Sequence, residues 1–156
     1  MKHPSAFSRQ RGVMLLEALI GILVFSIGIL ALVGLQAVSV KHVSEAKYRS
    51  DAAFLANQII AQMWADNPAN LANYAHQTTT TATCTFSGGA SANANVTGWL
   101  GATTTSGTVL GLLPGASTTK TQITVGAGNL VTVTICWQKP GEPVPHQYQA
   151  VAQING

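Results

Sequence analysis

The chain has 156 residues, which is enough for one domain and an attached segment. Only 8% of the residues are charged, against roughly 25% in an ordinary soluble protein. The formal net charge of +3 comes from Lys2, Arg9 and Arg11; beyond them five Lys/Arg residues balance five Asp/Glu residues, which argues against a basic face for nucleic acid.

The chain begins with a short, polar and basic segment, residues 1–12, and then becomes apolar. From Ala18 to Val40 there are 23 residues without a charge, which suffices for a helix across the roughly 30 Å hydrocarbon layer of a membrane. A secretory signal peptide has an apolar run of only about 7–15 residues, so this segment favours a lasting anchor. Three Lys/Arg residues precede the run and three follow it, so the positive-inside rule leaves the orientation open.

The helical pattern continues beyond the apolar run. Asp66-Asn67-Pro68 ends the pattern, because proline disfavours helix in the residue before it, and no proline occurs earlier than this after residue 4. We predict one helix from about Val13 to Asp66, roughly 80 Å long. Two pairs of opposite charge at i,i+4 spacing support its second half: Glu45–Arg49 and Lys47–Asp51.

The second half of this helix is amphipathic. Its apolar face predicts a buried stripe that starts between Tyr48 and Ala52 and needs a globular partner. Phe54 and Val43 lie off the stripe, either as ordinary exposed apolar side chains or as contacts with another subunit. The stripe consists of Tyr48, Ala52, Leu55, Ala56, Ile59, Ile60 and Met63.

The middle of the chain has weak secondary-structure signals. Residues 67–95 predict a polar connector with at most one short strand, around Thr83–Phe86. The Thr runs at 78–81 and 103–105 fit strand or loop composition, with O-glycosylation as the alternative. Apolar residues between 96 and 116 favour a short helix or turn that Pro114-Gly115 closes.

The last third shows the alternation of β-strands. Residues 121–125 and 129–138 alternate, and residues 146–154 form a last strand after the turn-rich loop KPGEPVP. On the second strand one face consists of Val131, Val133, Ile135 and Trp137. The sequence therefore predicts an α+β fold in which a small antiparallel meander covers the stripe of the long helix.

The segment GVMLLEAL, residues 12–19, follows the basic residues and places Glu17 five residues after Gly12. Together with the long helix and the small sheet, it resembles the type IV pilin family. The resemblance implies cleavage by prepilin peptidase between Gly12 and Val13 and N-methylation of the new terminus. It also implies four segments: a cytoplasmic leader (1–12), a transmembrane and assembly half of the helix (13–40), an amphipathic half (41–66) and a globular pilin head (67–156). The sequence itself shows no P-loop, no Rossmann glycine pattern and no metal-ligand spacing, so we expect neither a cofactor nor a metal.

The chain departs from the family pattern in two ways. Val13 stands where pilins usually carry Phe, which bears on methylation rather than on cleavage. The helix also lacks the proline that many pilins carry in the membrane half. Glycines in this half are either points where the helix loosens or positions of close packing between helices: Gly21, Gly28 and Gly34.

Glu17 is a lone carboxylate near the start of the apolar run, and such a group is unfavourable at membrane depth without a partner. Cleavage supplies a candidate partner, the α-amino group of Val13, because α-amino groups are mostly cationic at neutral pH. Pairing offsets part of the unfavourable transfer of both charges into lipid. The pair forms within one chain or with a neighbouring subunit; the alternative is a carboxylate that reaches the headgroups.

The two cysteines, Cys84 and Cys136, are too far apart in sequence for a C-x-x-C redox motif, and too few for a cysteine-rich zinc site. A head outside the cytoplasm favours a disulfide between them over two free thiols.

The remaining candidate groups show no site pattern. The histidines have neither ligand spacing nor an accompanying carboxylate cluster, and we predict them on the surface: His3, His42, His76 and His146. The tryptophans are predicted in the core or at an interface, since no basic groove accompanies them: Trp64, Trp99 and Trp137.

Residues 26–36 (SIGILALVGLQ) and 48–59 (YRSDAAFLANQI) narrow the resemblance to minor pilins of the PilV type, also called type IV pilus modification proteins. This implies a non-enzymatic subunit that helps to start pilus assembly, in the context of motility and adhesion. The implied partners are prepilin peptidase, other minor pilins, the major pilin and the inner membrane, with the head in the periplasm and neither nucleic acid nor a small-molecule substrate. A type II secretion pseudopilin is the alternative; a DNA-uptake pilin is less favoured, because the chain after residue 12 is neutral.

Overall fold

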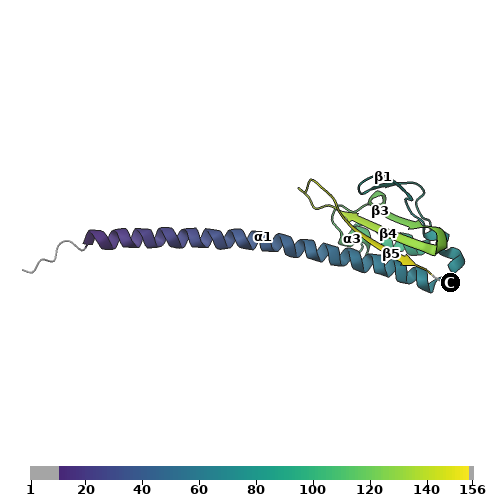
Figure 1. Cartoon of the computed structure of the whole chain (residues 1–156), viewed down its shortest axis with the longest axis horizontal. Helices are drawn as coiled ribbons and strands as arrows, with labels where there is room; N and C mark the ends of the chain where they lie inside the picture. Colours follow the sequence, from purple (N-terminus) through teal and green to yellow (C-terminus); the bar gives the residue numbers. More distant parts are fainter. Residues whose placement is uncertain (1–10, 155–156) are drawn as a thin grey trace, which may run out of the picture. The chain divides into compact units, whose positions relative to one another are not determined.

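The computed structural model describes residues 11–154, so most of the predicted leader, including His3, lies outside the described residues. The chain divides into two compact units, residues 1–44 and 45–156. One helix, α1 (Arg11–Ala65), contributes to both units (Figure 1). The prediction of a single helix from about Val13 to Asp66 is confirmed to within two residues at the start and one at the end.

Three strands of the second unit form one antiparallel sheet in the order β3-β4-β5 (Figure 1). The strands are β3 (Thr121–Val125), β4 (Leu130–Trp137) and β5 (His146–Gln153). β4 pairs with both neighbours, with Val133 opposite Ile123 on one side and opposite Ala150 on the other. The predicted antiparallel meander is therefore confirmed, and with it the α+β class.

The core lies between the amphipathic part of α1 and the inward face of the sheet. Tyr48 is partly buried and Ala52 is fully buried, so burial begins where the stripe predicts it. Side chains that alternate along β4 meet the stripe, as expected for a strand with one face inward. The stripe and the inward face of β4 both belong to this core: Ala52, Leu55, Ala56, Ile59, Ile60, Met63, Val131, Val133, Ile135 and Trp137.

Hydrogen bonds of Asp66 hold the end of α1. The Asp66 carboxylate accepts hydrogen bonds from the amide of Asn70 at 3.0 Å and the hydroxyl of Tyr74 at 2.8 Å. The bonds from Asn70, Tyr74 and the backbone N–H of Asn67 lower the pKa of Asp66 against the opposing effect of burial. Pro68 starts the 3₁₀ helix η1 (Pro68–Tyr74), which the predicted connector did not include.

A two-stranded hairpin packs on the other face of the sheet. It consists of β1 (Thr79–Ala82) and β2 (Thr85–Ser87), so the prediction of one strand around Thr83–Phe86 is wrong. The reason is local: Cys84 has a φ of +57° and turns the chain in the middle of the predicted strand. The Thr run at 78–81 supplies most of β1, whose four residues are all exposed.

The remaining helices are short, and all but one lie between the hairpin and β3 in sequence. Two of them are α-helical, α2 (Ala94–Leu100) and α3 (Val109–Leu112). Their buried apolar residues include Val96, Trp99 and Val109. Two single 3₁₀ turns flank β3: η2 (Thr118–Lys120) and η3 (Ala127–Asn129).

Gly115 makes the turn after α3, as the Pro114-Gly115 pair predicts. Its φ is +64°, and the backbone N–H of Gln138 donates to the carbonyl of Pro114 at 2.9 Å. A Cβ at position 115 would lie 2.5 Å from the carbonyl oxygen of Gln138. The backbone of Gln138, just after β4, thus lies too close to the turn for a side chain at position 115.

Gly115→Ala should lower the free energy of unfolding of the head by about 3 kcal/mol, because a positive φ and a backbone clash add together. Gly107→Ala is the matched control: its φ is +78°, but a Cβ there meets nothing within 4 Å, so about 1 kcal/mol is expected. Urea titration with pulse proteolysis of the full chain in detergent micelles measures both. Equal losses in the two variants would contradict the close approach at Gly115.

Candidate functional site

The first unit presents an apolar surface along α1. Within the described residues, Gly12–Ala65 is the one helix long and apolar enough to cross a membrane, and its most apolar window is entirely unburied. Large apolar side chains point outward all round it, for example the successive residues Leu23, Val24 and Phe25, which lie about 100° apart around the helix axis. A helix that is apolar all round and has no protein cover is typical of a membrane anchor or a signal segment.

The predicted processing and assembly residues lie in the first turns of this helix. Gly12, Val13 and Glu17 are all exposed, and Val13 precedes Glu17 by four residues, about one helical turn. The partner predicted for Glu17 is the α-amino group that cleavage after Gly12 would create on Val13. The predicted pairing of Glu17 therefore stays a prediction.

The glycines of the apolar half have open surroundings. A Cβ built on Gly21, Gly28 or Gly34 meets nothing within 4 Å. Neither predicted role, a loosening point or a close contact with another helix, is tested by the single chain. Open surroundings leave room for a neighbouring helix at each position.

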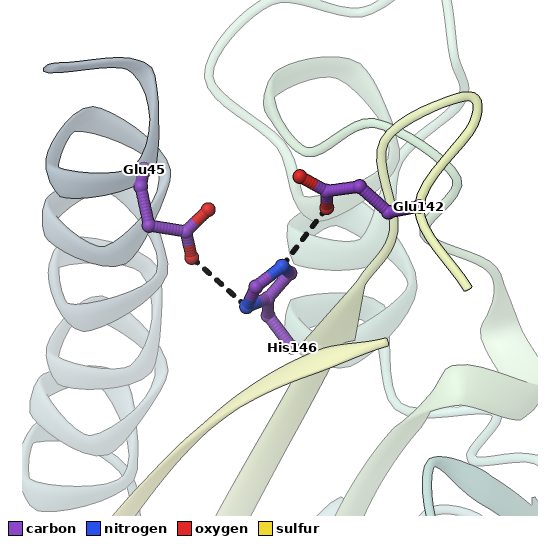
Figure 2. A group of neighbouring side chains, drawn as sticks. All are labelled: Glu45, Glu142 and His146. Carbon is purple, nitrogen blue, oxygen red and sulfur yellow. Dashed lines mark hydrogen bonds and ion pairs between the residues drawn. The ribbon is translucent and has the colours of Figure 1, made fainter. Parts of the chain in front are cut away.

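Four charged or titratable side chains gather in the second unit where α1 faces the start of β5, and Figure 2 shows three of them, Glu45, Glu142 and His146. The ring of His146 lies between two carboxylates, with Nδ1 2.9 Å from Glu45 Oε1 and Nε2 2.9 Å from Glu142 Oε2. Lys139 Nζ lies 3.0 Å from Glu45 Oε2 and 3.2 Å from Glu142 Oε1. We call Glu45, Lys139, Glu142 and His146 the head ion cluster.

Charge interactions in the head ion cluster outweigh burial. The hydrogen bond with Glu45, supported by Glu142, raises the pKa of Lys139 although burial opposes this. Burial works against ionisation of Glu142, yet Lys139 and His146 together lower the pKa of its carboxyl. The Lys139 contribution to stability is present below the ordinary pKa of 10.5 and the Glu142 contribution above 4.5, so these two contributions are both present between those limits.

Glu45, Glu142 and His146 offer one ligand atom each within 4.8 Å of one another, which raises the question of a metal ion. Two features argue against one. The Lys139 ammonium already contacts both carboxylates, and the two ring nitrogens face different carboxylates rather than a common point. The arrangement fits an ion-pair cluster better than a metal centre.

The histidine predictions need correction. His42 is exposed, as predicted. His76 is only 1% exposed, so its predicted place on the surface is wrong. His146 has carboxylate partners, although the sequence pattern indicated none. His76 Nδ1 accepts from the backbone N–H of Ser91 at 3.2 Å, so Nε2 carries the proton and donates to the carbonyl of Thr118 at 2.9 Å. These two bonds fix a neutral ring in the core.

One sequence signal could have pointed to the head ion cluster. Glu142 of the turn-rich loop and His146, the first residue after that loop, are four residues apart, and Glu45 lies on the same side of α1 as the buried stripe. We predicted that Glu45 pairs with Arg49 in the same helix. Glu45 instead contacts Lys139 of the loop and His146 at the start of β5. The Lys47–Asp51 pair is confirmed at 3.3 Å.

The predicted disulfide is present between Cys84 and Cys136, with a Cα–Cα distance of 5.7 Å. It connects the turn of the hairpin to β4. Trp99 and Trp137 are core residues, whereas Trp64 is half exposed, and Phe54 and Val43 are exposed. The two readings of Phe54 and Val43, surface residue or subunit contact, therefore both stand.

No family model, no curated protein and no solved structure matches this chain. The architecture is nevertheless pilin-like: a long N-terminal apolar helix whose second half packs on a small antiparallel sheet in a disulfide-bonded head.

Proposed function

We propose that this chain is a minor pilin of the PilV type, a non-enzymatic structural subunit that helps to start type IV pilus assembly. One observation carries the proposal: a single helix begins with the Gly12-Val13…Glu17 segment, continues as bare apolar surface, and ends as the core helix of a small β-sheet head. The bare surface needs lipid before assembly and other helices afterwards.

In this proposal prepilin peptidase removes residues 1–12 and the new N-terminus is methylated. The chain is held in the bacterial inner membrane by one span, with its N-terminus cytoplasmic and its head periplasmic, before it enters the fibre. Major and minor pilins contact it through α1. An extracytoplasmic head suits the Cys84–Cys136 bond, because disulfides persist in oxidising compartments.

Glu17→Ala should leave cleavage after Gly12 intact but reduce the number of copies in sheared pili at least about tenfold, because the Val13 ammonium would lose its carboxylate in a low-dielectric surrounding. Mass spectrometry of the membrane fraction measures cleavage, and quantitative immunoblotting of sheared pili measures incorporation.

Ser26→Ala is the matched control for Glu17→Ala. It also removes a polar group from the apolar half, but within residues 11–154 the Ser26 hydroxyl donates only to the carbonyl of Ile22 in its own helix, at 2.7 Å. Its incorporation should equal that of the wild type. Normal incorporation of Glu17→Ala would count against the ion-pair role, and an uncut wild-type chain would count against the whole proposal.

The same geometry would serve a type II secretion pseudopilin, which shares the leader and the helix. Recovery of the chain from sheared pili separates the two functions. Its absence from pili, with loss of protein secretion on deletion, would favour the pseudopilin.

A further inference from the structure

The contacts of His146 require a particular charge state. Both ring nitrogens lie 2.9 Å from carboxylate oxygens, which only accept hydrogen bonds when ionised (Figure 2). A neutral imidazole has one N–H, so it can donate to Glu45 or to Glu142 but not to both. Only the doubly protonated ring makes both contacts favourable.

The charges around the ring lead to the same conclusion. Glu45 faces it from α1, while Glu142 and Lys139 face it from the segment between β4 and β5. From β4, the uncharged indole of Trp137 stacks on it with ring centroids 5.8 Å apart. Two carboxylates and one ammonium sum to −1, and a proton on His146 brings the sum to zero.

The cluster joins two segments far apart in sequence. Glu45 is the first residue of the second unit, and His146 is the first residue of β5. Between β4 and β5 the chain carries Pro140, Pro143 and Pro145, so few backbone amides are available to hold it in place. Side chains of the head ion cluster therefore supply much of its attachment to α1.

We propose that His146 is a proton-dependent latch that fixes the segment 139–146 to α1 while the ring is charged. When the ring loses its proton, its positive charge disappears and only one of the two carboxylates can still accept a hydrogen bond from it, so the attraction to Glu45 of α1 weakens in either tautomer. Lys139 keeps its contacts across this change, so the segment loosens without detaching. The inference rests on the head alone and is independent of the proposed function.

Hydrogen exchange of the full chain in detergent micelles tests the latch. After correction for intrinsic rates, a peptide covering residues 138–149 should exchange roughly three- to tenfold faster at pH 8.0 than at pH 5.5, the range expected for partly exposed charge pairs. Imidazole is the side chain that changes charge between these pH values. In His146→Gln the two pH values should give the same rate.

Two further variants keep the test decisive. Glu45→Gln removes the α1 carboxylate and should abolish the pH dependence, while His42→Gln removes an exposed histidine of α1 and should preserve it. Nitrogen-15 NMR at pH 5.5 should show both His146 ring nitrogens protonated. The proposal is overturned if the wild type shows no pH dependence, if His146→Gln retains it, or if the ring is neutral at pH 5.5.

Discussion

Trp99→Ala should lower the free energy of unfolding of the head by about 4 kcal/mol, the largest effect of any single core truncation that we predict. Trp99 is 4% exposed, and its indole Nε1 donates to the carbonyl of Leu55 at 2.8 Å. It therefore joins α2 to the stripe of α1. Truncation removes the packing of a large ring and leaves a cavity beside the helix.

The measurement is a urea titration of the full chain in detergent micelles with pulse proteolysis, which does not depend on tryptophan fluorescence. At a slope of about 2 kcal/mol per molar urea, the midpoint should fall by roughly 2 M. Trp99→Phe should lie in between, since it keeps most of the packing and loses the hydrogen bond, worth about 1 kcal/mol.

Trp64→Ala is the matched control, because Trp64 belongs to the same fold but is half exposed on α1. Its loss should stay near 0.5 kcal/mol in the free subunit, as for surface substitutions in general. If Trp64→Ala and Trp99→Ala destabilise equally, the assignment of Trp99 to the core is wrong.

Periodic features of the sequence predicted most of the fold. The apolar stripe from Tyr48 to Met63 has the 3.6-residue period of a helix, and β4 alternates with the period of two that a strand requires. Each signal is local and repeated, so single deviations do not hide it. The end of α1 near Asp66 was predicted from Pro68 instead, because proline disfavours helix in the residue before it.

Features that depend on distant contacts could not be predicted in this way. The hairpin turn depends on a positive φ at Cys84, a conformation that few residues other than glycine adopt. The burial of His76 depends on Ser91 and Thr118, which only the folded chain brings to its two nitrogens. The head ion cluster likewise combines Glu45 with Lys139, 94 residues further along the chain.

Removal of the Cys84–Cys136 bond in a double Cys→Ala variant should lower the free energy of unfolding by about 4 kcal/mol, from the loop-entropy relation for a separation of 52 residues. The hairpin should suffer most. Its strand β1 is wholly exposed, and β2 buries only Phe86, so few apolar contacts remain to hold it on the sheet without the bond. Exchange should accelerate most in Thr79–Ser87.

Comparison of single and double variants identifies the cause of the loss. If the cross-link itself stabilises the head, Cys84→Ala alone should lose nearly as much as the double variant, because either change breaks the bond. If packing of the buried sulfurs matters instead, the double variant should lose clearly more than either single one. Reduction of the wild type with dithiothreitol keeps both sulfur atoms in place and should still reproduce most of the effect. The single variant, the double variant and the reduced wild type could instead each lose less than about 1 kcal/mol. The hairpin would then be held without the disulfide, by contacts such as the hydrogen bond that the Gln122 amide donates to the carbonyl of Gln77 at 2.9 Å.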